Sequence, residues 1–243
     1  MDPRLKKLEL KTSITALADF LLPRSCLVCS KTLLPQEKHL CLECLADLPL
    51  THYQTRSRNP MADLLNAALP DEDRYAYASA LFFYSSDTGY DKITQALKYK
   101  RNFSAGKYFS KMLAERIKGS ELYKDVDMVV PVPLHWLRLR RRGYNQAEII
   151  ASKVAEVLGV PCARKALKRA RNTGTQTKRS ASQRARNMKG AFRPGKALPQ
   201  CVHILLVDDV FTTGATTAAC LETLRKMQGP QARISVATLA FVE

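Results

Sequence analysis

Apolar residues follow two different spacings along most of the chain. From about Tyr75 onward, short apolar runs typical of buried strands alternate with segments whose apolar residues recur at helical spacing. The clearest helix is predicted over 146–158, where Gly159 ends an apolar face. The pattern predicts strands at 77–84, 127–133, 203–207 and 234–242, and further helices at 90–98, 109–117 and 216–227. Strands that alternate with helices build parallel sheets, so we predict a doubly wound α/β domain over residues 75–243.

The first 74 residues do not follow this alternation. Residues 1–22 predict a short amphipathic helix, residues 23–50 hold four cysteines, and residues 51–74 predict a polar linker around a short helix. Residues 170–200 carry few apolar side chains and predict a long loop. No apolar run approaches the roughly 20 residues that span a bilayer, and no signal-peptide pattern follows the charged start. We expect a cytoplasmic protein, with attachment to the inner membrane surface as an open alternative.

Positive charge is the strongest signal in the composition, because 39 Lys+Arg stand against 22 Asp+Glu and give a formal net charge of +17. Such an excess favours a polyanionic partner such as nucleic acid. Residues 157–207 contain no acidic residue, whereas a solvated surface usually mixes signs, so this segment is suited to anions. Its cations are Arg164, Lys165, Lys168, Arg169, Arg171, Lys178, Arg179, Arg184, Arg186, Lys189, Arg193 and Lys196.

Four cysteines form two matched pairs near the N-terminus. Cys26 and Cys29 are separated by two residues, and after eleven further residues Cys41 and Cys44 repeat that spacing. Each pair places two thiolates on one side of a tight turn, and two turns complete a tetrahedral Zn²⁺ site with no open position. A redox pair or chance spacing are the alternatives, and His39 lies between the pairs as a substitute ligand that four cysteines do not need. So short a segment cannot bury enough apolar surface to fold alone, so we expect structural zinc to stabilise it.

Two adjacent carboxylates and a small, hydroxyl-rich turn follow the apolar run at 203–207. Asp208 and Asp209 suit the hydroxyls of a ribose as hydrogen-bond acceptors, with indirect contact to Mg²⁺. The turn that follows can direct backbone N–H groups and threonine hydroxyls at a phosphate on the helix N-terminus. A merely capped helix is the alternative, and the missing Walker A lysine disfavours an ATPase. The residues of the turn are Thr212, Thr213, Gly214, Ala215 and Thr216.

This stretch resembles the phosphoribosyl pyrophosphate (PRPP) binding motif of type I phosphoribosyltransferases. The resemblance implies that Asp208 and Asp209 hold the ribose and that residues 212–216 hold its 5′-phosphate. A narrower resemblance, over about 23–243, is to the ComF family, also called the ComFC or amidophosphoribosyltransferase-like family. It is carried by the leading cysteines, by 96–100 (ALKYK), 130–134 (VPVPL) and 142–147 (RGYNQA), and by Thr177, Lys178, Arg179, Arg184, Asn187, Gly190, Ala191 and Phe192. It implies a type I phosphoribosyltransferase-like domain over 75–243, behind a zinc module.

The resemblance also implies two loops around the ligand. Residues 131–135, with Val132 and Pro133, match the pyrophosphate loop, and about 169–187 match a flexible loop that closes over the site. Arg179 is then a candidate catalytic residue beside Asp208 and Asp209. The excess of cations over what one small ligand can contact predicts a nucleic-acid track, and Trp136, Tyr144 and Phe192 are either stacking platforms or core. The predicted track is Arg138, Arg140, Arg141, Arg142, Lys178, Arg179, Arg184 and Arg186.

We therefore predict a competence-associated protein that binds PRPP or a similar ribose phosphate and handles single-stranded DNA during natural transformation. A DNA-uptake helicase or a membrane channel protein is the expected partner. Two alternatives stay open at this point. One is an active phosphoribosyltransferase that moves ribose 5-phosphate to a base or amine with Mg²⁺. The other is an adaptor whose zinc module recruits a partner.

Overall fold

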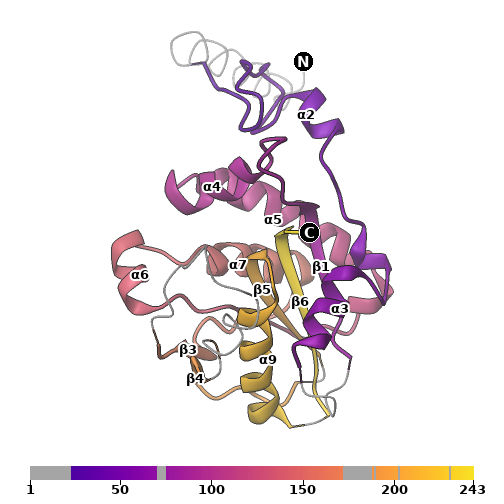
Figure 1. The fold of residues 1–243 in the computed structure, drawn as a ribbon, viewed down its shortest axis with the longest axis vertical. Helices are drawn as coiled ribbons and strands as arrows, with labels where there is room; N and C mark the ends of the chain where they lie inside the picture. Colours follow the sequence, from indigo (N-terminus) through magenta and orange to yellow (C-terminus); the bar gives the residue numbers. More distant parts are fainter. Residues whose placement is uncertain (1–22, 70–74, 172–187, 189, 202, 230) are drawn as a thin grey trace, which may run out of the picture.

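Four parallel strands form the central sheet, in the order β1-β6-β5-β2 (Figure 1). The computed structural model describes residues 23–69, 75–171, 188, 190–201, 203–229 and 231–243, so the helix predicted at 1–22 lies outside the described residues. The two longest strands lie in the middle of the sheet. The strands are β1 (Ala78–Phe83), β2 (Met128–Pro131), β5 (His203–Phe211) and β6 (Arg233–Phe241).

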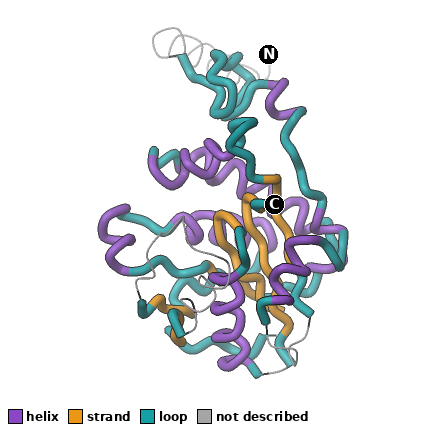
Figure 2. Tube along the Cα trace, viewed as in Figure 1, coloured by secondary structure: helices purple, strands orange, loops and turns teal. Residues whose placement is uncertain are grey.

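Helices cover both faces of the sheet (Figure 2), which gives the three layers expected of a parallel sheet. Along β5, Leu205 and Val207 belong to the buried cluster that includes α5 and α7, while Ile204 and Leu206 belong to the cluster that includes α3 and α9. The helices are α3 (Pro60–Ala67), α4 (Asp91–Tyr99), α5 (Phe103–Lys118), α7 (Gln146–Leu158) and α9 (Ala215–Gln228), with short η1 (Tyr53–Thr55) and η2 (Glu121–Tyr123). The predicted α/β class and parallel sheet are confirmed.

The cysteine segment, with its short helix α2 (Leu42–Ala46), packs against α4 and α5. Cys26, Val28 and Leu40 belong to the same buried cluster as Leu97 and Phe109. Polar contacts also join the two parts. Lys92 Nζ donates to the Val28 carbonyl at 2.8 Å, and the Tyr90 hydroxyl donates to the Cys44 carbonyl at 3.0 Å. In the segment predicted as a linker, α3 buries Met61, Ala62 and Leu65.

Several elements differ from the sequence prediction, and the helix predicted at 109–117 is the longer α5, which begins at Phe103. The strand predicted at 203–207 continues to Phe211, because residues 208–211 pair with β6. A short helix that was not predicted, α6 (Trp136–Arg142), projects from the loop after β2. The loop predicted over 170–200 contains β4 (Phe192–Pro194), which pairs with β3 (Leu167–Arg169) in a separate antiparallel ladder. That ladder joins distant segments, and neither strand shows an alternating apolar pattern.

Candidate functional site

The turn between β5 and α9 leaves a helix N-terminus without a side-chain cap. Gly214 is its N-cap residue and adopts φ 72°, where a β-carbon would lie 2.8 Å from Phe211 Cζ. The glycine therefore allows both the left-handed backbone and the close approach of the phenyl ring. The Thr217 hydroxyl donates to the Gly214 carbonyl at 2.8 Å, whereas Thr212 is exposed at the surface. Free N–H groups and a threonine hydroxyl at a helix N-terminus suit a phosphate.

The paired acids lie at the carboxyl end of β5, immediately before this turn. Asp209 is buried, and its Oδ2 lies 3.0 Å from Lys98 Nζ. Asp208 is half-buried, and burial followed by the negative charge of Asp209 raises the pKa of its carboxyl to about 8. Burial and the adjacent acid thus favour the protonated form of Asp208 more than in a free aspartate. A carboxyl group accepts hydrogen bonds from sugar hydroxyls when ionised and can also donate one when protonated.

Lys98 was given no role in the sequence analysis, although it lies within the 96–100 motif. It comes from the last turn of α4, and its side chain is 24% exposed. Burial alone would lower the pKa of this ammonium, but the charge and hydrogen bond of Asp209 raise it above its ordinary value. Lys98 thus stays charged beside the two acids. Its place in the 96–100 motif is the one sequence signal that pointed to it, because the pairing with Asp209 exists only in the assembled fold.

The loop after β2 lies directly beside the acids. Pro131 pairs with Val207, and the Val132 N–H donates to the Val207 carbonyl at 2.9 Å. Asn145, the N-cap residue of α7, donates from Nδ2 to the Val132 carbonyl at 3.0 Å and so fixes this loop. The structure therefore brings Val132 and Pro133 to the same edge of the sheet as Asp208, Asp209 and residues 212–216.

The predicted DNA track is only partly described. Arg140 and Arg141 are exposed on α6, whereas Arg138 is half-buried. Arg142 bonds to Gln146 and lies over the Tyr99 ring at 5.7 Å. Lys178, Arg179, Arg184 and Arg186 lie outside the described residues.

The sequence analysis left three aromatic side chains as either stacking platforms or core residues, and the structure distinguishes among them. Phe192 is buried, at 5% exposure, and belongs to the core. Tyr144 is half-buried, and its hydroxyl donates to the Lys98 carbonyl at 3.1 Å, which supports a positioning contact. Trp136 is 59% exposed and remains available to a ligand.

The four cysteines of the two pairs lie together. Their sulfur atoms are all within 4.8 Å of one another, and Cys29 Sγ lies 3.7 Å from Cys41 Sγ. Tetrahedral Zn²⁺ with bonds of about 2.3 Å separates its sulfur ligands by about 3.8 Å, so this group could hold a metal ion of that kind. The His39 ring instead packs on Tyr108 at 5.4 Å, with Nε2 3.3 Å from Ser104 Oγ. His39 therefore faces α5, as expected of a residue that four cysteines make unnecessary as a ligand.

Comparison with known proteins decides the family. The chain is 33% identical over 206 residues to DNA utilization protein YhgH of Escherichia coli K12, which covers 82% of this chain and 83% of that protein. It is 31% identical over 140 residues to competence protein F of Haemophilus influenzae, and 29% identical over 120 residues to competence protein ComFC of Streptococcus pneumoniae. The chain belongs to the ComF family. It spans 61% of the Haemophilus ComF protein and 49% of the Streptococcus one.

Comparisons with protein-family models and with solved structures give no match or only weak similarity. No protein-family model matches the chain. Adenine phosphoribosyltransferase covers 60% of the chain at 15% identity with a TM-score of 0.36. Orotate phosphoribosyltransferase from Aeropyrum pernix covers 74% at 16% identity with a TM-score of 0.35. These similarities are too weak to indicate a ligand. In the described part of this ComF protein, no helix has the length and apolar character needed to cross a bilayer.

Proposed function

We propose that this ComF protein binds PRPP or a similar ribose phosphate and handles single-stranded DNA during natural transformation. The observation that carries the proposal is the arrangement at the carboxyl edge of β5, where two acids, one lysine and an uncapped helix N-terminus meet. In open α/β sheets, ligands bind outside the carboxyl ends of the strands. The relatives named competence protein F and DNA utilization protein support the link to DNA.

In this proposal each part of a sugar phosphate has a matching group. The 5′-phosphate would lie on residues 212–216, and the ribose hydroxyls on Asp208 and Asp209. A pyrophosphate would lie beside Val132 and Pro133, where Mg²⁺ would neutralise part of its charge. Lys98 Nζ lies 3.0 Å from Asp209 Oδ2 and adds a positive charge to the edge.

The zinc module has a structural role in this proposal. Cys26, Cys29, Cys41 and Cys44 would hold one Zn²⁺, and all four positions are filled by protein. Elemental analysis should give one zinc per chain, and Cys29→Ser with Cys41→Ser should remove it. Metal-free protein with unchanged stability would contradict a structural zinc. We place the protein in the cytoplasm or on the inner membrane surface, with a partner from the DNA-uptake machinery.

Calorimetric titration with PRPP and Mg²⁺ tests the ribose-phosphate site. Asp208→Asn with Asp209→Asn should abolish binding while keeping the side-chain shapes. The matched control is Glu121→Gln with Glu156→Gln, which removes two exposed acids elsewhere and should leave the affinity unchanged. Equal affinity in both double variants would refute the site. Release of pyrophosphate on adding a base or amine would favour the active transferase instead.

A further inference from the structure

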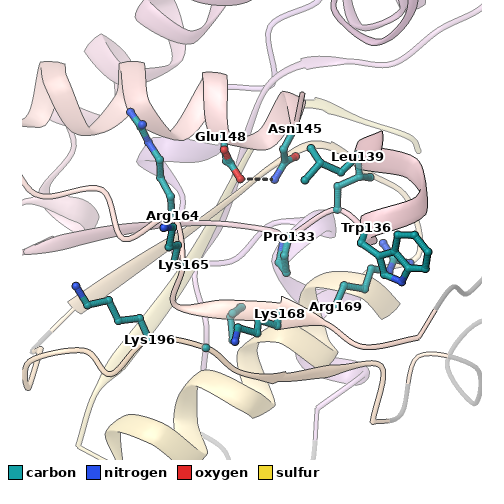
Figure 3. A pocket seen from close by; sticks show the side chains of 13 residues that line it. Pro133, Trp136, Leu139, Asn145, Glu148, Arg164, Lys165, Lys168, Arg169 and Lys196 are labelled. Atoms are coloured by element: carbon teal, nitrogen blue, oxygen red, sulfur yellow. Dashed lines mark hydrogen bonds between the residues drawn. The ribbon is translucent and has the colours of Figure 1, made fainter. Parts of the chain in front are cut away.

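A basic groove lies beside the candidate ribose-phosphate site (Figure 3). A hollow of about 600 Å³ is bounded by α6, by β3 and by the turn after β4, with Pro133 in its wall. A second hollow of about 550 Å³ continues from it along α7. The two hollows share Leu139, Asn145, Glu148 and Arg164 as lining residues, so they form one groove.

The charge of the first hollow is strongly one-sided. Among the described residues that line it, Glu148 is the only one with a carboxylate, and its Oε1 lies 3.4 Å from Asn145 Nδ2. Because a solvated face usually mixes signs, a wall of cations indicates an anionic occupant with several charges. The cations that line it are Arg164, Lys165, Lys168, Arg169 and Lys196.

An aromatic ring stands at the rim of the same hollow. Trp136 lines it, is 59% exposed, and lies on a helix that buries no residue. Exposed aromatic faces beside basic grooves stack unpaired bases, whereas a double helix keeps its bases inside. Phosphate-binding cations and a stacking ring together match a single strand better than a small phosphate compound. Pro133 lines the hollow and belongs to the loop after β2, which is bonded to Val207 immediately before the paired acids, so the groove adjoins the candidate ribose-phosphate site.

We propose that this groove is the path of single-stranded DNA across the protein. Lys165, Lys168 and Lys196 contact backbone phosphates, and Trp136 stacks one base. The inference rests on the proposed handling of DNA and adds the surface that performs it.

Tryptophan fluorescence reports directly on this path, because Trp136 is the single tryptophan of the chain. An oligo-dT strand should quench the fluorescence and saturate at the concentration at which anisotropy of a labelled strand saturates. A strand of abasic sites of the same length keeps the phosphates without the bases. It should bind more weakly and leave the fluorescence nearly unchanged.

Two variants separate the phosphate contacts from the stacking contact. Replacing Lys165, Lys168 and Lys196 with Ala should reduce the slope of log affinity against log salt by about 2, at roughly 0.7 per lost contact on a single strand. Trp136→Leu should weaken oligo-dT binding about five-fold to a hundred-fold, keep the salt slope, and leave abasic binding unchanged. The matched control replaces Lys111, Lys118 and Lys226, three exposed lysines outside both hollows.

The outcomes distinguish this path from the function on which it rests. Oligo-dT could bind without quenching Trp136 and with the same affinity and salt slope in the groove triple variant as in the control variant. That result would show that DNA binds elsewhere and that the proposed path is wrong. If the wild-type protein binds no single strand, the proposed DNA function fails and the path fails with it. Loss of binding counts only in variants whose melting temperature matches that of the wild type.

Discussion

Both ends of the central sheet contain buried titratable side chains, but these side chains are paired more completely at the amino end than at the carboxyl end. At the amino end, His203 is fully buried and both ring nitrogens are paired. Nδ1 lies 2.7 Å from Asp125 Oδ1, and Nε2 lies 2.8 Å from Ser235 Oγ. Asp125 Oδ2 accepts from Arg233 at 2.9 Å. His203, Asp125, Ser235 and Arg233 thus form a network in which each of the four side chains has a partner inside the protein.

At the carboxyl end of the sheet, the charged side chains and the helix terminus are less completely paired. Asp208 and Asp209 are adjacent acids with Lys98 as the neighbouring ammonium, and the helix N-terminus beside them has no side-chain cap. A fully paired network stabilises a fold, whereas incompletely paired charge at an open edge is a common feature of ligand sites. We therefore expect changes at the amino end to affect stability and, under the proposed function, changes at the carboxyl end to affect binding.

The largest expected effect is at the amino end. His203→Ala should lower the free energy of unfolding by about 3 kcal/mol, because it leaves Asp125 Oδ1 and the buried Ser235 hydroxyl without a partner and removes a fully buried side chain. PRPP affinity of the folded variant should not change. Urea unfolding and calorimetric titration measure the two quantities, and a lost ligand affinity with intact stability would reverse the assignment.

Gly214→Ala should act at the carboxyl end. A residue with a β-carbon in this left-handed conformation costs about 1–2 kcal/mol, and the Phe211 ring must also move. Phosphate affinity should fall more than stability does, since the turn itself is displaced. Urea unfolding measures the change in stability, and calorimetric titration measures the change in affinity. Gly159, which ends α7 in the left-handed conformation with no atom within 4 Å of an added β-carbon, provides the control as Gly159→Ala.

Stability should depend on pH with opposite signs at the two ends. Burial lowers the pKa of His203, so below about pH 6.5 the unfolded chain takes up a proton that the folded chain does not, and stability falls in acid. The pKa of Asp208 is raised from 3.8 to about 8, so the folded chain holds the extra proton across that range and stability falls as pH rises through it. Each slope is limited to about 1.4 kcal/mol per pH unit.

Two variants identify the residue that causes each dependence of stability on pH. Asp208→Asn should remove the fall on the alkaline side, and His203→Ala should reduce the fall in acid. Unfolding curves collected from pH 4 to pH 9 decide this. An alkaline slope that persists in Asp208→Asn would show that another group titrates there.

The smallest effect is expected from an exposed ion pair near the amino end. Lys124 Nζ lies 2.7 Å from Glu121 Oε2, and both side chains are mostly exposed. Water screens such pairs, so Lys124→Ala should not measurably shift the unfolding midpoint. A large shift would mean that charge alone, without burial, stabilises this end.

The sequence predicted the parts of the fold that depend on local signals. The bounds of α7 match because Asn145 caps its start and Gly159 ends it with a positive φ. The turn at 212–216 between a strand and a helix was predicted from contiguous residues in the same way, and its binding of phosphate stays a prediction. By contrast, α6 buries no residue and shows no amphipathic pattern. The ion pair of Lys98 with Asp209 joins segments far apart in the chain, as does the β3–β4 ladder, and neither is visible before the sheet is assembled.

Hydrogen–deuterium exchange with and without PRPP and Mg²⁺ tests the central claim most directly, because it locates the ligand in the unaltered protein. The account predicts slower exchange of backbone amides at 212–217 and 132–135, at the carboxyl end of the sheet. It predicts no change at 123–127 or around Arg233, at the amino end. Unchanged exchange throughout 212–217 at saturating PRPP, or protection confined to the amino end, would contradict it.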